Sequence, residues 1–211
     1  RFRANIYTQR GLVNLALRVI PSVIPTFQSL GLPPVVQKMA ENQRGLILVS
    51  GTTGSGKSTT LAAIVDHINS TRKAHILTIE DPIEFVHKNK KSIVNQRELG
   101  LDTLSYSEAL RSAMREDPDV ILVGEMRDLE TVSSAITAAQ TGHLVLSTIH
   151  TTNTIQIISR ILDLYPPYQQ VQVRLQLAET LKGAISQRLL PVAQGSGRVA
   201  ALEIMVVTPL I

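Results

Sequence analysis

Short apolar runs alternate with longer amphipathic stretches over most of the chain. The runs are rich in Val, Ile and Leu, which is typical of strands buried on both faces of a parallel sheet. The stretches between them have the spacing and capping residues of helices. The expected core strands are 46–49, 74–80, 119–125 and 143–149. This alternation predicts an α/β fold with a mostly parallel sheet and crossover helices.

Helix ends and turns are marked by residues with known preferences. Ser105 and Glu108 form a capping box that predicts a helix reaching Glu116. Asp128 and Gly142 mark the start and end of another helix. The further expected elements are helices at 35–42 and 60–65, two helices separated at 166–167, a small hairpin of 85–87 with 92–95, and a last hairpin turning at 195–197.

The first residues do not resemble the start of such a domain. Residues 2–7 and 15–20 read as two strands joined around Gln9-Arg10-Gly11. We therefore expect residues 1–20 to end a preceding domain, residues 21–34 to be a proline-rich linker and residues 35–211 to form the main domain. The chain begins at Arg1 rather than Met and stops at 209–211 without a terminating signal, so we expect a piece of a longer polypeptide.

One glycine-rich segment between an expected strand and an expected helix matches the pattern G-x-x-x-x-G-K-[ST]. Its backbone amides and the helix N-terminus suit phosphate oxygens. Lys57 is expected to reach the β- and γ-phosphates, and the Ser58 hydroxyl to hold Mg²⁺. A chance glycine-rich turn is the alternative, and the flanking elements argue against it. The predicted nucleotide-binding residues are Gly51, Thr52, Thr53, Gly54, Ser55, Gly56, Lys57, Ser58 and Thr59.

Acidic residues follow two of the other expected strands. Parallel sheets place their sites at the carboxyl ends of strands, where Glu80, Asp81 and Glu125 all fall. The position before Glu125, often an Asp that holds Mg²⁺, is Gly124 here, so we expect the metal to be held through water or by Glu80, Asp81 or Glu84. Glu125 is the predicted base that deprotonates the attacking water; an ordinary carboxylate at a helix start is the alternative.

Two arginines and two histidines complete the candidate set. Arg111 and Arg115 lie four residues apart, on one helix face. They are expected either to reach the phosphates or to form a solvated pair matched to Glu108 and Glu116. His143 and His150 bracket one strand, and a strand histidine is usually structural. His150, at the carboxyl end, is the predicted γ-phosphate sensor.

The amino-acid composition limits which binding partners and which cellular compartment are expected for the chain. The charged fraction of 18% is below the usual ~25%, which fits a domain that buries surface against partner subunits. Lys88-Asn89-Lys90-Lys91 is the one basic cluster, and without Trp a base-stacking platform is not expected. No cysteine is present, which excludes disulfides and thiolate metal sites and permits a reducing cytoplasm. No apolar run is long enough to span a membrane, and no signal peptide is visible.

Four blocks carry a resemblance to a known family: TGSGKSTT, ILTIEDPIEF, REDPDVILVGEMRD and TGHLVLSTIHTTN. They resemble the Walker A, Asp box, Walker B and His box of the secretion-superfamily ATPases, and glycine before the Walker B Glu is typical of them. EDPIEFVH, EALRSAMREDPD and GRVAALEIM are most similar to type IV pilus retraction ATPases. Assembly and type II secretion ATPases usually carry a four-cysteine zinc insertion, so the absence of cysteine favours the retraction branch.

The resemblance implies a hexameric ring of RecA-like P-loop domains, each preceded by a PAS-like domain, with ATP and Mg²⁺ bound at the phosphate loop between the two. Residues 1–20 would then be the edge of the PAS-like domain. The implied location is the cytoplasmic face of the inner membrane, against the pilus platform protein and not inserted in the bilayer. The residues with implied roles are Lys57 and Ser58 for nucleotide and Mg²⁺, Glu84 and Glu125 for hydrolysis, His143 and His150 in the His box, Arg111 and Arg115 near the phosphates, and Arg3 and Arg18 on the preceding domain.

Three other functions remain open from the sequence. The same residues would serve a pilus assembly or type II secretion ATPase. RecA-like rings also translocate nucleic acid, although the scarce aromatics and scattered basic charge argue against it. A catalytically idle ring subunit is disfavoured by the intact motifs.

Overall fold

The computed structural model describes residues 2–21, 23–193 and 195–208. Arg1 and residues 209–211, the two ends discussed above, lie outside the described part of the chain.

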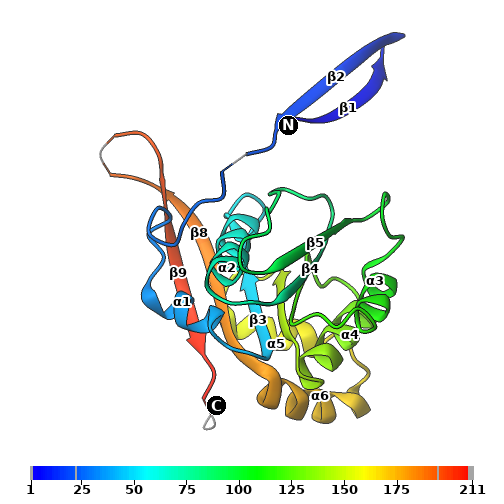
Figure 1. Ribbon diagram of the computed structural model, residues 1–211, viewed down its shortest axis with the longest axis vertical. Coiled ribbons are helices and arrows are strands. Elements are labelled where there is room, and N and C mark those ends of the chain that lie inside the picture. Colours follow the sequence, from blue (N-terminus) through cyan, green and yellow to red (C-terminus); the bar gives the residue numbers. More distant parts are fainter. Residues whose placement is uncertain (1, 22, 194, 209–211) are drawn as a thin grey trace.

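A seven-stranded sheet forms the centre of the domain, in the order β5-β4-β6-β7-β3-β8-β9 (Figure 1). Every neighbouring pair is parallel except β8 with β9. The predicted α/β fold with a mostly parallel sheet is confirmed. The strands are β3 (Gly45–Ser50), β4 (His75–Glu80), β5 (Ile93–Glu98), β6 (Val120–Val123), β7 (Leu144–Ile149), β8 (Leu181–Pro191) and β9 (Arg198–Val206).

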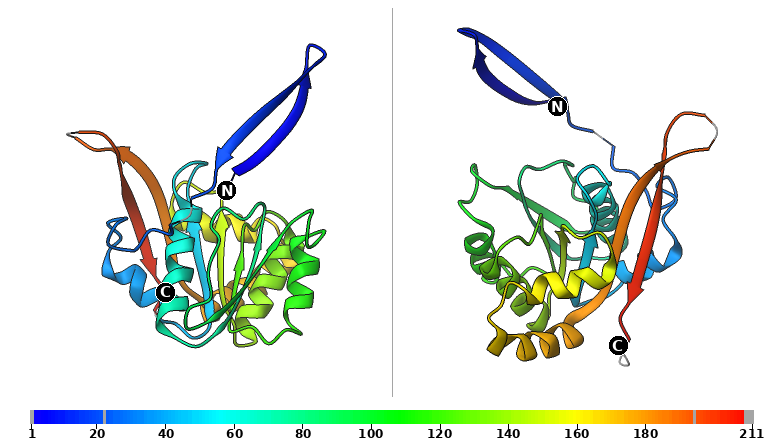
Figure 2. Two further views of the ribbon diagram at one scale, coloured as in Figure 1. Left: turned by 45° about the horizontal axis from the view of Figure 1, so that its top comes forward. Right: turned by 180° about the vertical axis from the view of Figure 1, so that it is seen from behind.

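Helices cover both faces of the sheet, which is why its central strands are apolar on both sides. Helices α1 and α2 pack on one face around Ile47, Ile64 and Ile185. Helices α3 to α6 pack on the other around Leu110 and Ile136 (Figures 1 and 2). The helices are α1 (Pro34–Ala40), α2 (Lys57–Thr71), α3 (Tyr106–Ala113), α4 (Leu129–Gln140), α5 (Thr154–Leu162) and α6 (Pro167–Thr180).

The predicted helix caps at Ser105 and Asp128 are confirmed. The Ser105 hydroxyl accepts the amide of Glu108, and the Asp128 carboxylate accepts the amide of Thr131. Helix α3 ends at Ala113, three residues before the predicted end.

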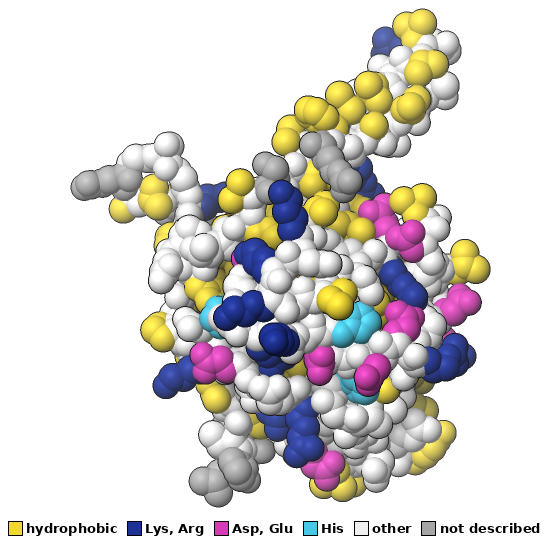
Figure 3. All heavy atoms as spheres, in the orientation of Figure 1, with side chains coloured by type: hydrophobic (Ala, Val, Ile, Leu, Met, Phe, Trp, Pro, Cys, Tyr) yellow, Lys and Arg dark blue, Asp and Glu magenta, His cyan; other side chains and the backbone are white. Residues whose placement is uncertain are grey.

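The first two strands form a separate antiparallel hairpin, β1 (Phe2–Gln9) with β2 (Leu12–Val19), which turns at Arg10 and Gly11 as predicted. The hairpin projects away from the sheet (Figures 1 and 2). Apolar side chains along it are exposed, with Ile6 at 70% and Val13 at 74% (Figure 3). An isolated two-stranded hairpin is marginally stable at best, so these side chains need a further packing partner.

The predicted hairpin of 85–87 with 92–95 is wrong. Strand β5 instead pairs in parallel with β4, and no strand forms over 85–87. The Gln96 side chain takes the place of a ladder, because it donates to the Phe85 carbonyl at 2.9 Å and accepts the His87 amide at 2.8 Å. The loop is therefore held to the sheet edge by a side chain, which an apolar pattern cannot reveal.

The strand order decides where the functional side chains meet. Strand β7 lies between β3, which leads into the phosphate loop, and β6, which leads into Glu125. The carboxyl ends of β3, β4, β6 and β7 consequently open onto one edge of the sheet.

Candidate active site

The phosphate loop joins β3 to α2 at this edge. Gly51, Gly54 and Gly56 have φ values of 142°, 78° and 91°, a region that side chains with a Cβ rarely adopt. Helix α2 begins at Lys57, directly after Gly56. The free amides of its first turn therefore face the edge where an anion would bind.

The loop residues differ in how they lie relative to a cleft of about 280 Å³. Thr53, Gly54, Lys57 and Ser58 line the cleft. Gly51 and Ser55 are buried, whereas Thr52 is exposed. Thr59 lines a neighbouring pocket instead. The structure thus places four of the nine predicted residues against the cleft by their side chains or Cα.

Lys57 is the one buried cation of the loop, with 9% of its surface exposed. Its Nζ donates to the carbonyl oxygens of Gly51 at 2.9 Å and Thr52 at 3.0 Å. Burial lowers the pKa of Lys57, and the nearby carboxylates of Glu125 and Glu84 oppose that shift. The acceptors of this partly desolvated ammonium are neutral carbonyls. An anion with several charges, such as a polyphosphate, would therefore bind the ammonium more strongly than these carbonyls do.

Three acids on the β4 side line the same cleft: Glu80, Asp81 and Glu84. Glu80 accepts from the Thr78 hydroxyl at 2.6 Å and from the Gln96 amide at 3.1 Å. Burial raises the pKa of Glu80, and these hydrogen bonds offset part of the rise. Asp81 and Glu84 are exposed, so their carboxylates are free to meet a hydrated metal.

Glu125 is held by two cationic or ionisable side chains. Arg127 Nε lies 2.7 Å from Glu125 Oε2, and His150 Nε2 lies 3.4 Å from the same oxygen. All three residues line the cleft. The structure therefore brings Glu125 and His150 together opposite Lys57, as the positions at the strand ends predicted.

Gly124 has a steric reason to be glycine. A Cβ at this position would lie 2.8 Å from the Tyr106 hydroxyl and 3.2 Å from the Ile79 carbonyl oxygen. An Asp side chain would collide with both. Burial, followed by the charge of Glu125, raises the pKa of Tyr106, so this hydroxyl remains protonated beside the Walker B strand.

Two side chains of β7 hydrogen-bond to the end of β6, directly before Glu125. The Ser147 hydroxyl donates to the Val123 carbonyl at 2.8 Å, and the Thr148 hydroxyl donates to the Gly124 carbonyl at 2.7 Å. The strand that ends at His150 and the strand that ends at Glu125 are thus locked together.

The residues present fit a magnesium ion held largely by nucleotide and water. Mg²⁺ prefers oxygen ligands and usually takes only one or two from the protein. The Ser58 hydroxyl and the carboxylates of Glu80, Asp81 and Glu84 share the cleft. Within the described residues, no group of three or more His, Asp or Glu side chains is close enough to hold a metal alone.

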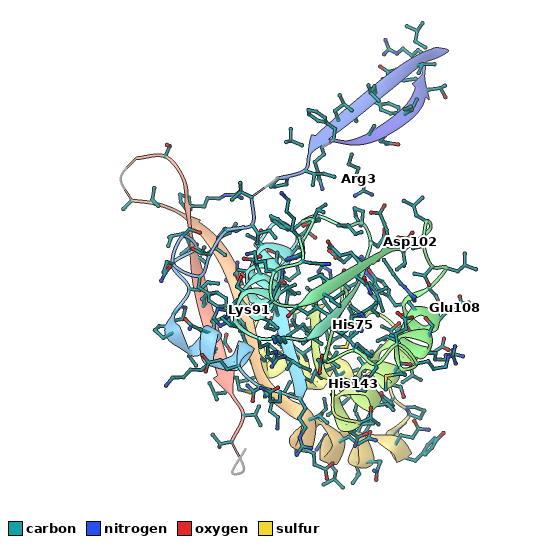
Figure 4. The ribbon with its side chains drawn as sticks, viewed as in Figure 1. Arg3, His75, Lys91, Asp102, Glu108 and His143 are labelled. Atoms are coloured by element: carbon teal, nitrogen blue, oxygen red, sulfur yellow. The ribbon has the colours of Figure 1, made fainter. Side chains whose placement is uncertain are left out.

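Three predicted site residues that follow the phosphate loop along the chain lie away from the cleft. His143 precedes β7 at the opposite edge of the sheet, where its Nδ1 contacts the Ala138 carbonyl at 2.9 Å (Figure 4). Arg111 forms an ion pair with Glu130 of α4, not with Glu108 or Glu116. Arg111 and Arg115 line a separate groove beside α3. None of these three residues lines the cleft of its own chain in the described structure.

Arg3 and Arg18 face each other across the N-terminal hairpin. Together with Thr59 and Glu84 they line a second pocket, between the hairpin and the α/β domain. Figure 4 shows Arg3 between these two parts of the molecule. The hairpin arginines therefore approach the Asp-box loop without reaching the cleft that contains Lys57.

A family model described as "Type II/IV secretion system protein" matches residues 13–207. The chain belongs to this secretion family. It is 56% identical over 211 residues to the type IV pilus retraction ATPase PilT of Pseudomonas aeruginosa, and 55% identical over 210 residues to a twitching motility protein of Neisseria gonorrhoeae. These alignments cover 100% and 99% of this chain, and 61% and 56% of the two relatives.

Among solved structures, the pilus retraction motor PilT with bound ADP matches with a TM-score of 0.95 and 58% identity. The match covers 98% of this chain and 60% of the solved one. The predicted RecA-like fold is confirmed by this agreement. The chain spans about three fifths of the length of these relatives. Among the described helices, none combines the length and apolar character needed to cross a membrane.

Four further polar residues of the cleft had no role assigned to them from the sequence of this secretion-family chain. Arg127, Tyr106, His87 and Thr148 all line it. Arg127 follows Glu125 by two residues, and that spacing was the only available signal. Tyr106 and His87 come from loops and helices whose approach to the cleft depends on the fold, so sequence order could not identify them.

His87 makes the stability of this secretion-family domain pH-dependent. Burial lowers the pKa of His87 from 6.5 to about 4, and its buried Nδ1 has no hydrogen-bond partner among the described residues. Since the unfolded chain binds this proton more readily, stability contributed by neutral His87 is lost as pH falls from about 6.5 towards 4.

Between pH 7.5 and pH 4.5 the free energy of unfolding is expected to fall less in the His87→Phe variant than in the unmutated protein. The difference between the two falls is expected to be at most about 3 kcal/mol. The measurement is urea unfolding at pH 7.5 and pH 4.5 in both proteins. Identical losses of unfolding free energy would contradict the burial of a neutral imidazole.

Proposed function

We propose that this chain is the motor part of an ATP-hydrolysing, homo-hexameric type IV pilus retraction ATPase. The observation that carries the proposal is the meeting of Lys57 and Ser58 with Glu125 across one cleft at the sheet edge. The 56% identity to the retraction ATPase PilT supports the choice of retraction over other secretion-family activities. The lack of cysteine supports it further.

The chain's residues divide the work of phosphoryl transfer to water. The α2 N-terminus and Lys57 bind and orient the β- and γ-phosphates. Ser58 and the acids Glu80, Asp81 and Glu84 would hold Mg²⁺, which supplies charge neutralisation on the phosphates when bound. Glu125 takes a proton from the attacking water at Oε1.

Arg127 and His150 orient the Glu125 carboxylate for this step. Both contact Oε2, at 2.7 Å and 3.4 Å, so Oε1 is the oxygen left to face the water. We infer that His150 reports the presence of the γ-phosphate through the same contact.

The remaining predicted arginines act between subunits or domains in this proposal. Arg111 and Arg115 lie on a groove away from their own cleft, and a ring would bring them toward a neighbour's phosphates. Arg3 and Arg18 sit on the hairpin, which we assign to the edge of a preceding PAS-like domain (residues 1–20, with a linker at 21–34). Its exposed apolar side chains support that assignment. His143 is left with a structural role.

The proposed partners are further copies of the chain and the inner-membrane pilus platform, at the cytoplasmic face of that membrane. Attachment would be peripheral, and no direct contact with nucleic acid is expected. Hydrolysis that needs a neighbour's arginine would couple chemistry to movement between domains.

Deleting the gene tests the direction of work. Cells that lack a retraction motor are expected to carry surplus pili that do not retract, because polymerisation continues without depolymerisation. Pilus counts by electron microscopy and retraction by fluorescence microscopy measure this. Bald cells would instead indicate an assembly motor, and DNA-stimulated ATP hydrolysis by the full-length protein would indicate a translocase.

A further inference from the structure

One buried amide lies directly beneath the phosphate loop. Gln187 is on β8, which pairs with β3 so that Ser186 lies opposite Ser50, the last residue before the loop. Only 3% of Gln187 is exposed. Its side chain points to the α2 face of the sheet, as does Ile185 two residues earlier. A glutamine at this depth requires partners for both ends of its amide.

Both ends of the Gln187 amide are used, and both partners belong to the nucleotide-binding segment. Nε2 donates to the Ser55 carbonyl at 2.8 Å, and Oε1 accepts from the Thr60 hydroxyl at 2.7 Å. Ser55 is in the loop and Thr60 in the first turn of α2. One side chain therefore ties the sheet to the loop and to the helix that follows it.

Two loop glycines are shaped around the same residue. A Cβ on Gly51 would lie 2.3 Å from the main-chain carbonyl oxygen of Gln187, and a Cβ on Gly56 would lie 2.7 Å from the side-chain Nε2 of Gln187. The loop backbone at both ends is thus in direct contact with Gln187. These glycines provide the close approach through which Gln187 reaches the Ser55 carbonyl.

The contact of Gln187 with Ser55 matters because the first residues of the loop are held only by Lys57, whose contacts a ligand can displace. Lys57 Nζ donates to the carbonyls of Gly51 and Thr52, and a bound phosphate would compete for that ammonium. Gln187 does not line the cleft in the described structure, so its two hydrogen bonds can persist when Lys57 turns to a ligand.

We propose that Gln187 is a positioning residue for nucleotide binding: it holds the phosphate loop and the start of α2 in the binding conformation without touching the ligand. This inference rests on the proposed function. A loop that is already ordered loses less conformational entropy when it binds phosphate, so the amide contributes to affinity indirectly.

The test compares Gln187→Met, which keeps the length of the side chain but removes both hydrogen bonds, with Ile185→Ala on the same face of β8. Both variants lose core stability, and only the first loses contact with the loop. In the full-length protein without nucleotide, hydrogen exchange by mass spectrometry is expected to be about tenfold faster in peptides covering 51–58 for Gln187→Met than for Ile185→Ala. The dissociation constant for ADP, measured by calorimetry, is expected to rise about tenfold in Gln187→Met only.

Equal exchange and equal ADP affinity in the two variants would overturn the proposal and leave Gln187 as core packing. If Gln187→Met does not fold, the Thr60→Val variant is measured instead, because valine has the shape of threonine but cannot donate the hydrogen bond to Gln187 Oε1. Faster exchange of the loop in Thr60→Val supports the proposal, and unchanged exchange overturns it. If the unmutated protein binds no ADP, the proposed function fails. The exchange measurements on the nucleotide-free protein still decide the role of Gln187.

Discussion

Lys57→Ala is expected to abolish ATP turnover. The variant removes the one buried cation of the phosphate loop, which two loop carbonyls and the nearby Glu84 and Glu125 hold in place. No other residue of the loop carries a positive charge. We expect a fall in kcat/KM of about 10³-fold or more, since lost charge stabilisation at a transferring phosphoryl group typically has this scale.

Phosphate release by the full-length protein measures the effect, with Lys38→Ala as the matched control. Lys38 is an exposed lysine of α1, so its removal should leave hydrolysis unchanged. Hydrolysis at the unmutated rate in Lys57→Ala, with a circular dichroism spectrum like that of the control, would refute the assignment of the cleft as the ATP site.

Glu125→Gln is expected to retain ATP and stop its hydrolysis. The amide has the shape of the carboxylate and can still accept from Arg127, but it cannot take a proton from water. Loss of a general base typically lowers kcat by about 10²- to 10⁴-fold. Removing a negative charge near the phosphates should leave nucleotide affinity unchanged or raise it. Calorimetric binding of ATP together with single-turnover hydrolysis separates the two effects.

The control for this variant is Glu179→Gln, the same substitution at an exposed position of α6. It should match the unmutated protein in both measurements. A Glu125→Gln protein that folds but no longer binds ATP would mean that Glu125 holds the nucleotide or its metal, and not the proton of the attacking water.

Local patterns with a defined backbone consequence were sufficient to predict most of this fold. The strand, loop and helix around Gly51–Thr59 were predictable because glycine, lysine and apolar residues each have a direct steric or electrostatic reason to be where they are. The caps at Ser105 and Asp128 were predictable for the same reason.

Features that depend on long-range contacts were not predictable. Residues 85–87 and 92–95 read as two apolar runs around a lysine-rich tip. The Gln96 and Asn89 side chains instead hold 85–92 as a loop, and 93–95 belong to β5, which pairs with β4. The Arg111 partner is Glu130, nineteen residues away and on another helix, so spacing along α3 could not identify it. The reason for Gly124 lies in Tyr106, which only the folded chain brings beside it.

The position of β7 between β3 and β6 sets the width of the reaction space. Neighbouring strands are about 4.8 Å apart, so two strands separated by a third are about 10 Å apart. Lys57 Nζ is held at the end of β3 by the Gly51 and Thr52 carbonyls, and Glu125 follows β6. The ammonium and the carboxylate therefore face each other across a gap that one phosphoryl group and one water can occupy. If the two strands were adjacent, the side chains would meet as an ion pair and exclude both. The intervening strand β7 thus acts as a spacer. It prevents direct pairing of the Glu125 carboxylate with the Lys57 ammonium and leaves room for the ligand between them.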